Sequence, residues 1–174
     1  KKDITLEIEV TPNRGDVLSH LGVARYLSAL LHRPWHLPKF KLSEIKSSDT
    51  QPIKVNIASN VGCQRYCARL IRNVKIESSP QWLQTRLNNI GIRPINNVVD
   101  ITNYILMDTG HPLHAFDHDC LQGNTINIRL AKSGEKLTTL DGQQYTFKGK
   151  ELVIADEKYP IALAGVMGGL DTEV

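Results

Sequence analysis

Amide, hydroxyl and imidazole side chains are concentrated between residues 96 and 117 of the chain. Residues 96–104 read Asn-Asn-Val-Val-Asp-Ile-Thr-Asn-Tyr, and residues 111–117 read His-Pro-Leu-His-Ala-Phe-Asp. The polar side chains stand among apolar ones, and polar groups that leave water need partners, such as a ligand or a reacting group. An imidazole exchanges protons near neutral pH. We therefore expect Thr102, Asn103 and His114 to hold a polar substrate and a water molecule, with water as the nucleophile.

A purely structural explanation of Thr102 and Asn103 stays open at this point. Both residues lie near a predicted helix end or turn. Thr and Asn side chains often cap a helix or form hydrogen bonds with the nearby backbone. The residue types alone do not decide between this role and contact with a substrate.

A second candidate for ligand contact is the glycine-containing segment at residues 164–169, which reads Ala-Gly-Val-Met-Gly-Gly. Glycines allow close approach of the backbone, so that peptide N–H groups can point at a ligand. The segment matches neither a dinucleotide-binding fingerprint nor a P-loop. A plain tight turn is the competing explanation.

A metal site is the third possibility. Its candidate ligands are three histidines, two aspartates and a cysteine: His111, His114, His118, Asp117, Asp119 and Cys120. Such side chains suit zinc or a similar ion. However, Pro112 stands inside the His-x-x-His pair, and the spacing matches no common zinc motif. We favour a single working imidazole with two solvated neighbours.

The composition is that of a globular protein. The chain has 174 residues, of which 41% are hydrophobic and 22% charged, so it fits one domain, or one domain and part of another. A net charge of +3 is too small to argue for nucleic acid. No run of about 18 apolar residues predicts a membrane span. The three cysteines have no framework spacing, which indicates a reducing, cytoplasmic setting.

The pattern along the chain predicts an α+β fold with a mixed, mostly antiparallel sheet and helices. A helix capped by Asp16 is expected to end before Pro34, a second to span Gln81–Ile90 after a Ser79 cap, and a third to span 97–107. The predicted strands are 4–10, 53–57, 66–76, 136–140, 144–147, 152–155 and 161–164, with strand-like sequence from 125 onward. The pair Asp141-Gly142 predicts a hairpin turn.

Residues 47–52, Ser-Ser-Asp-Thr-Gln-Pro, predict a linker, which we place at 46–52. The segment 1–45 then forms a small strand-helix piece of a neighbouring domain, and 53–174 forms a second module. We expect this module to be truncated at its C-terminus, because the sequence stops soon after a glycine pair.

Several motifs, in order, resemble the bacterial-type phenylalanyl-tRNA synthetase β chain. They occupy residues 11–19, 22–25, 91–104, 112–117, 140–142 and 163–169, and so cover nearly the whole chain. The resemblance implies that 1–45 is the end of the preceding β-chain domain. It also implies that 53–174 is an editing module that hydrolyses mischarged Tyr-tRNA(Phe).

The resemblance further implies partners and a location for the intact enzyme. An α subunit forms the aminoacyl-adenylate with ATP and magnesium and charges tRNA(Phe), in a cytoplasmic heterotetramer without membrane contact. The chain itself would need no cofactor, and a tyrosine or tyrosyl ester would occupy its editing pocket. A non-catalytic tRNA-docking or assembly module is the alternative, and a metal-dependent hydrolase that uses the three histidines is a third hypothesis.

The resemblance also implies roles for individual residues, because their positions match the motifs of the family. His114 and Asn103 would line the site near the ester, with Thr102 and Pro112 as neighbours. Ala164 and Gly165 would form part of the tyrosine pocket, and Gly168 matches another glycine of it. Arg93 is a candidate for contact with the tRNA acceptor end, on charge alone. The family also uses a downstream Glu to accept from the tyrosine hydroxyl, and this sequence stops before it.

Overall fold

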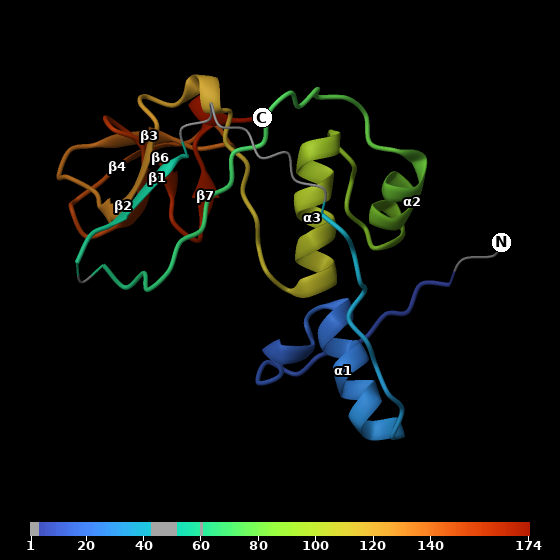
Figure 1. Ribbon diagram of the computed structural model, residues 1–174. Coiled ribbons are helices and arrows are strands. Elements are labelled where there is room, and N and C mark those ends of the chain that lie inside the picture. Colours follow the sequence, from blue (N-terminus) through green and yellow to red (C-terminus); the bar gives the residue numbers. More distant parts are fainter. Residues whose placement is uncertain (1–3, 43–51, 60) are drawn as a thin grey trace. The chain divides into compact units, whose positions relative to one another are not determined.

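The computed structural model describes residues 4–42, 52–59 and 61–174, and its fold is α+β, as predicted. The chain divides into two compact units (Figure 1). The helical unit comprises Lys1–Lys46 and Lys75–Ala115, and the sheet unit comprises Ser47–Val74 and Phe116–Val174. Residues 75–115 thus group with the N-terminal piece, whereas the predicted boundaries join them to the second module. The predicted linker lies outside the described residues except for Pro52.

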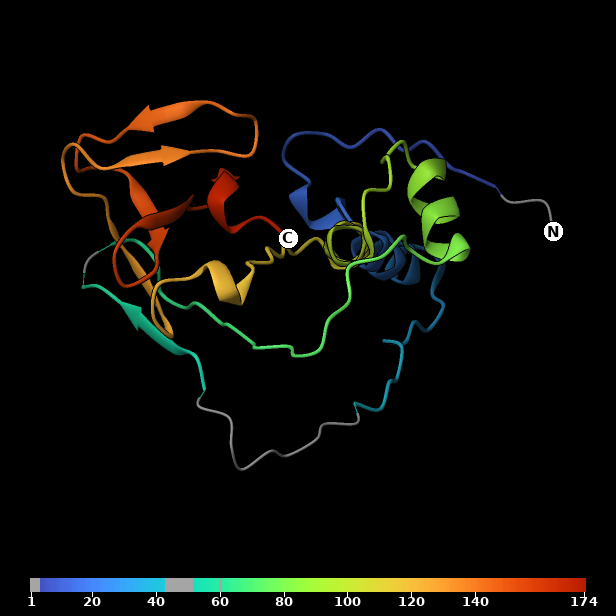
Figure 2. The same ribbon diagram turned by 90° about the horizontal axis from the view of Figure 1, so that it is seen from above.

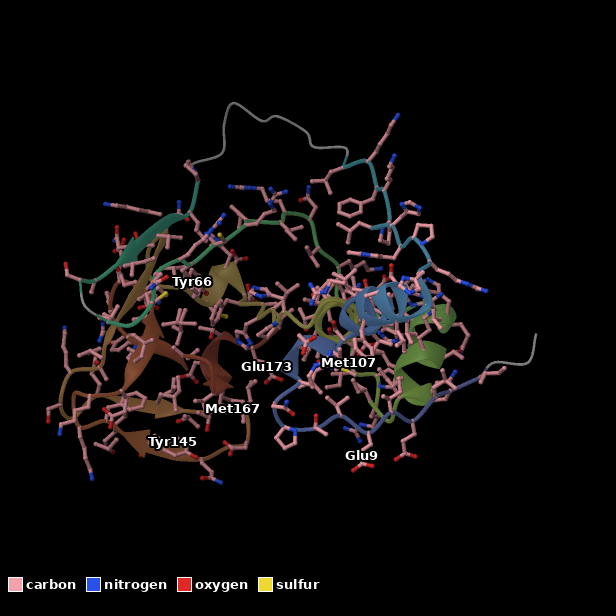
Figure 3. The ribbon with its side chains drawn as sticks, turned by 90° about the horizontal axis from the view of Figure 1, so that it is seen from below. Glu9, Tyr66, Met107, Tyr145, Met167 and Glu173 are labelled. Carbon is pink, nitrogen blue, oxygen red and sulfur yellow. The ribbon has the colours of Figure 1, made fainter. Side chains whose placement is uncertain are left out.

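In its described residues, the helical unit contains three α-helices and a short 3-10 turn. They are η1 (Gly15–Val17), α1 (His20–Leu31), α2 (Gln81–Asn89) and α3 (Asn97–Thr109). Both α1 and α2 contact α3. Leu83 and Leu87 of α2 are buried, and a ring nitrogen of His20 lies 3.0 Å from the carbonyl oxygen of Met107, which is labelled in Figure 3. The long helix α3 is therefore the scaffold of this unit.

Two helix starts differ from the prediction. The cap of α1 is Ser19, whose hydroxyl accepts from the amide of Gly22 at 3.0 Å, while Asp16 lies in η1. Gly22 fits there because an added Cβ would lie 2.1 Å from the Asp16 carbonyl oxygen. The N-cap position of α2 is Pro80, because the Ser79 hydroxyl is buried and bonded elsewhere.

Two predicted strands are wrong. No β-strand is assigned to residues 4–10 or 66–76, all of which the structure describes. The apolar side chains of Ile4 and Leu6 are 81% and 76% exposed. A strand requires a partner for its backbone groups, and alternation alone does not provide one. In the second segment, Asn73 adopts a left-handed conformation with φ +58°, which breaks an extended run.

The sheet unit is built on a five-stranded sheet with the order β1-β2-β5-β6-β7. Its strands are β1 (Lys54–Ile57), β2 (Thr125–Leu130), β5 (Leu152–Ala155), β6 (Pro160–Leu163) and β7 (Met167–Gly168). Only β1 and β2 pair in parallel among these strands, so the sheet is mixed and mostly antiparallel, as predicted. Two 3-10 turns, η2 (His118–Cys120) and η3 (Leu170–Thr172), complete the unit.

A separate hairpin joins β3 (Lys136–Thr138) to β4 (Gln144–Thr146), and Figure 2 shows it as a distinct pair of strands. Gly142, with φ +77°, donates its amide to the Thr139 carbonyl at 2.8 Å, so the predicted Asp-Gly turn is confirmed. Buried side chains of β2, β5 and the hairpin form the core, including Ile128, Val153 and Leu137. Among the described residues, no helix has the length and apolar character that a membrane crossing requires.

Candidate functional site

Helix α3 presents two of the predicted site residues, and its ends are fixed by local interactions. The Asn96 side chain accepts from the amides of Val98 and Val99 at 3.0 and 2.9 Å, which caps the helix start. Gly110, with φ +78°, caps its end. The helix is therefore held at both ends, and the positions of Thr102 and Asn103 along it are fixed.

Thr102 and Asn103 differ in how their side chains are used. The Thr102 hydroxyl donates to the carbonyl oxygen of Val99 at 2.7 Å, which is the back-bonding that the structural explanation predicts. Its oxygen can still accept a hydrogen bond. Asn103 is half-buried, and its amide forms no hydrogen bond with the residues that the structure describes. Asn103 is thus the better candidate for contact with a substrate.

His114 lies in the segment that follows α3. Its ring belongs to an exposed residue, yet neighbouring atoms displace water from it, and this desolvation lowers the pKa of His114. The neutral imidazole, which can accept a proton, is therefore favoured at neutral pH. Pro112 and Arg93 are exposed in the same unit. The helical unit thus contains five predicted site residues: Arg93, Thr102, Asn103, Pro112 and His114.

The other three predicted residues belong to the sheet unit, at the turn between β6 and β7. The Val166 amide donates to the Leu163 carbonyl at 3.1 Å, and Gly165 has φ +71°, so the segment is a tight turn. The Ala164 amide donates to the carbonyl of Leu152 at 3.0 Å. Among the described residues, the Gly165 amide has no such acceptor. A Cβ added at Gly165 would meet nothing within 4 Å.

Residues 164–166 can therefore form a tight turn and also present a peptide N–H group to a ligand. The turn leaves one exposed peptide donor at Gly165. Gly168 is instead buried in β7 and pairs with Ala162 of β6. Figure 3 labels Met167, its neighbour on the same strand.

The sheet unit also has a cavity of about 410 Å³ that no sequence pattern predicted. Its lining includes Lys136, Gln144 and Tyr159 near the hairpin and β6. Asp171 and Thr172 of η3 complete it, and the buried Thr172 hydroxyl has no hydrogen-bond partner among the described residues. These side chains lie far apart in the sequence, so only the fold could reveal that they share one cavity.

The three histidines do not form a metal site within the described residues. No group of three or more His, Cys, Asp or Glu side chains there is arranged to hold an ion. A ring nitrogen of His118 lies 3.2 Å from the side-chain oxygen of Asn124. The three cysteines are free thiols, and burial and nearby carboxylates raise the pKa of Cys120.

Comparison with known proteins places these residues in a family. Residues 62–174 match the family model described as the B3/4 domain. The chain is 52% identical over 173 residues to the phenylalanine–tRNA ligase beta subunit of Moorella thermoacetica and 46% identical over 172 residues to that of Fusobacterium nucleatum. The corresponding subunit of Anaeromyxobacter dehalogenans is 50% identical over 172 residues.

Each of these matches covers 99% of this chain and 21 or 22% of the relative. The chain thus spans about a fifth of the length of the relatives. The resemblance inferred from the motifs is confirmed, since the ordered signatures lie inside one continuous match. The chain therefore belongs to the B3/4 domain family, and its sequence is similar throughout to a stretch of phenylalanine–tRNA ligase beta subunits.

Proposed function

We propose that this chain is the proofreading module of a phenylalanine–tRNA ligase beta subunit and hydrolyses Tyr-tRNA(Phe). The observation that carries the proposal is the imidazole of His114. Desolvation lowers the pKa of this imidazole, and His114 lies in the segment that directly follows the helix bearing Asn103. A neutral imidazole and an amide that forms no hydrogen bond with the described residues are groups that can orient a water molecule and an ester.

The reaction is a simple hydrolysis. The oxygen of water forms a bond with the ester carbonyl carbon, and the bond from that carbon to the terminal ribose oxygen breaks. The water gives up a proton, and the ribose oxygen leaves as a hydroxyl. His114 either accepts the water proton or orients the water, and Asn103 holds the ester or the ribose.

Selection of tyrosine over phenylalanine depends on one hydroxyl group. An apolar pocket rejects an added hydroxyl only weakly, by roughly a hundredfold. A pocket with a peptide donor reverses this preference, because phenylalanine leaves the donor unpaired at a cost of about 1–3 kcal/mol. The exposed Gly165 amide is such a donor. Ala164 and Gly165 are accordingly the proposed tyrosine-binding residues.

The partners of the proposed function are those that the resemblance to the phenylalanyl-tRNA synthetase β chain implies. The parent protein would work in the cytoplasm with an α subunit, in a heterotetramer that binds tRNA(Phe). ATP and Mg would serve aminoacylation in that assembly, and no cofactor is proposed for the residues of this chain.

The test is deacylation of Tyr-tRNA(Phe) by the full-length protein. His114→Ala combined with Asn103→Ala should reduce the rate at least a hundredfold, while His111→Ala, a change in the same segment, should leave it within about twofold. Unchanged deacylation by the double variant would refute the assignment of these residues. Wild-type protein that supports tRNA charging but leaves Tyr-tRNA(Phe) intact would instead favour a docking or assembly module.

A further inference from the structure

Helices α2 and α3 share a surface cluster of two aromatic rings and one guanidinium, which we call the Trp82 cluster: Trp82, Arg86 and Tyr104. The rings of Trp82 and Tyr104 pack edge to face with centroids 5.8 Å apart. The Arg86 guanidinium carbon lies 5.6 Å from the Trp82 centroid and 5.9 Å from the Tyr104 centroid. Arg86 also donates to the Tyr104 hydroxyl at 2.8 Å.

In the Trp82 cluster, Trp82 and Arg86 are exposed and Tyr104 is half-buried. Trp82 is 55% exposed, whereas Leu83 and Leu87, on the inner side of the same helix, are buried. An indole is the largest apolar side chain, and its exposure in a cluster ordered by a second ring indicates a face that receives a flat partner. The Tyr104 contact fixes the ring before any ligand arrives, which reduces the entropy lost on binding.

The charge around the cluster favours an anionic partner. Helix α2 reads Gln-Trp-Leu-Gln-Thr-Arg-Leu-Asn-Asn and contains no carboxylate. Within the described parts of the chain, no carboxylate forms an ion pair with Arg86. The same unit offers a contrast, because Arg14 lies 4.6 Å from the Tyr26 ring but forms two hydrogen bonds with Asp16. The positive charge of Arg14 is thus neutralised locally, whereas no described carboxylate neutralises that of Arg86.

We propose that the Trp82 cluster is a stacking platform for an unpaired nucleotide at the end of an RNA. Trp82 would stack on the base, and Arg86 would pair with the adjacent phosphate. Aromatic stacking and an arginine that neutralises phosphate are the common elements of single-strand recognition. Its identification with the tRNA acceptor end rests on the proposed function, and Tyr104 and Asn103 lie within one turn of the same helix, α3.

The test measures binding of a short labelled single-stranded RNA ending in unpaired cytidine and adenosine nucleotides to the full-length protein. Trp82→Ala should weaken binding about tenfold to a hundredfold, and Trp82→Phe should retain most of the affinity. Arg86→Gln should lower the slope of log Kd against log salt concentration by about one, because one phosphate contact is lost. Because both side chains are exposed, the variants should unfold within a few degrees of the wild type.

Tyr26→Ala is the matched control, since it removes an aromatic ring beside an arginine that already has a carboxylate partner. It should leave RNA affinity within about twofold. Equal affinity of Trp82→Ala and the wild type would overturn the proposal. If Trp82→Ala changed the mass of the assembly and not RNA affinity, the cluster would be a protein contact, which also overturns it.

The experiments distinguish a failure of the stacking-platform proposal from a failure of the proposed hydrolytic function. His114→Ala tests deacylation, and Trp82→Ala tests binding of the single strand. If deacylation is absent from the wild type while Trp82→Ala still weakens RNA binding, the platform stands and the hydrolytic proposal falls. If Trp82→Ala has no effect on binding while His114→Ala abolishes deacylation, the reverse holds.

Discussion

The hydroxyl of Ser79 donates to the carboxylate of Asp100 at 2.5 Å, and both residues are buried. The second carboxylate oxygen of Asp100 accepts from the amide of Ile95 at 2.8 Å. Asp100 belongs to the first turn of α3, and Ser79 precedes α2. One carboxylate therefore fixes the connection between the two helices that carry the Trp82 cluster and Asn103.

Asp100→Ala should lower the free energy of unfolding of the protein by about 3–5 kcal/mol. The change leaves the Ser79 hydroxyl and the Ile95 amide buried without an acceptor, and each unpaired group costs about 1–3 kcal/mol. Denaturant unfolding measures the effect. Asp108→Ala on the same helix is the control and should cost less than about 1 kcal/mol. Similar losses for the two variants would show that the Ser79–Asp100 bond does not organise the helices.

Gly169→Ala should lower the free energy of unfolding by about 1–3 kcal/mol, through crowding alone. An added Cβ would lie 2.6 Å from the Ile161 carbonyl oxygen and 2.9 Å from a methyl carbon of Leu137. Gly169 has φ −82°, so no backbone strain contributes. Gly15→Ala, where a Cβ meets nothing within 4 Å, is the control. Equal thermal stability of the two variants would contradict the crowding.

Gly165→Ala separates backbone strain from crowding. A methyl group meets nothing within 4 Å, but φ is +71°, which costs about 1–2 kcal/mol in a residue with a Cβ. The same methyl group would occupy open space beside the proposed peptide donor. We expect at least a tenfold loss in the ratio of kcat/KM for Tyr-tRNA(Phe) over Phe-tRNA(Phe). An unchanged ratio in a folded variant would exclude Gly165 from the tyrosine pocket.

Local sequence signals predicted the helices better than the strands. Helix α3 begins after an Asn cap and ends at Gly110, both of which act within a few residues of the helix. The segments 4–10 and 66–76 carry strand-like alternation and yet form no strand, because pairing depends on residues distant in the sequence. Strands β2 and β5 have such partners and were predicted correctly.

The candidate site was predictable only in its residue types. The motifs indicated Asn103 and His114 as candidates, and the residue type of Thr102 allowed the bond back to Val99, but no local pattern indicates that Gly168 is part of a strand. Asp100 gave no signal, since an acidic residue in the first turn of a helix usually faces solvent and interacts with the helix dipole. Its burial depends on Ser79, 21 residues earlier.

The ion pair between Arg129 and Glu135 should make the sheet unit sensitive to acid. Two bonds of 2.8 Å join the side chains, which are 20% and 16% exposed. The bond from Arg129 holds the pKa of Glu135 below its usual value near 4.5. A carboxyl group whose pKa is lower in the folded than in the unfolded protein stabilises the folded state at pH values above its pKa in the unfolded protein. This contribution is lost as the pH falls through the pKa of the group in the folded protein.

Glu135→Gln should therefore cost about 1–3 kcal/mol at pH 7 and progressively less as the pH falls below about 4.5. Urea unfolding at several pH values measures this difference. Glu173→Gln, at an exposed position labelled in Figure 3, should give a small difference at every pH. A cost of Glu135→Gln that stays constant between pH 7 and pH 3 would contradict the role of the charge.

The pH dependence of deacylation distinguishes the two roles of His114. Desolvation lowers the pKa of His114 from its usual value of 6.5, so the neutral ring predominates at pH 7. If His114 accepts the proton of water, kcat/KM should be constant above the folded pKa and fall tenfold per pH unit below it, with a midpoint below 6.5. His114→Gln can orient water but cannot take its proton. If His114 only orients the water, the His114→Gln variant should therefore retain much of the rate and lose only the fall in kcat/KM at low pH. A midpoint above 6.5, after subtraction of spontaneous hydrolysis, would show that the titrating group is not this imidazole.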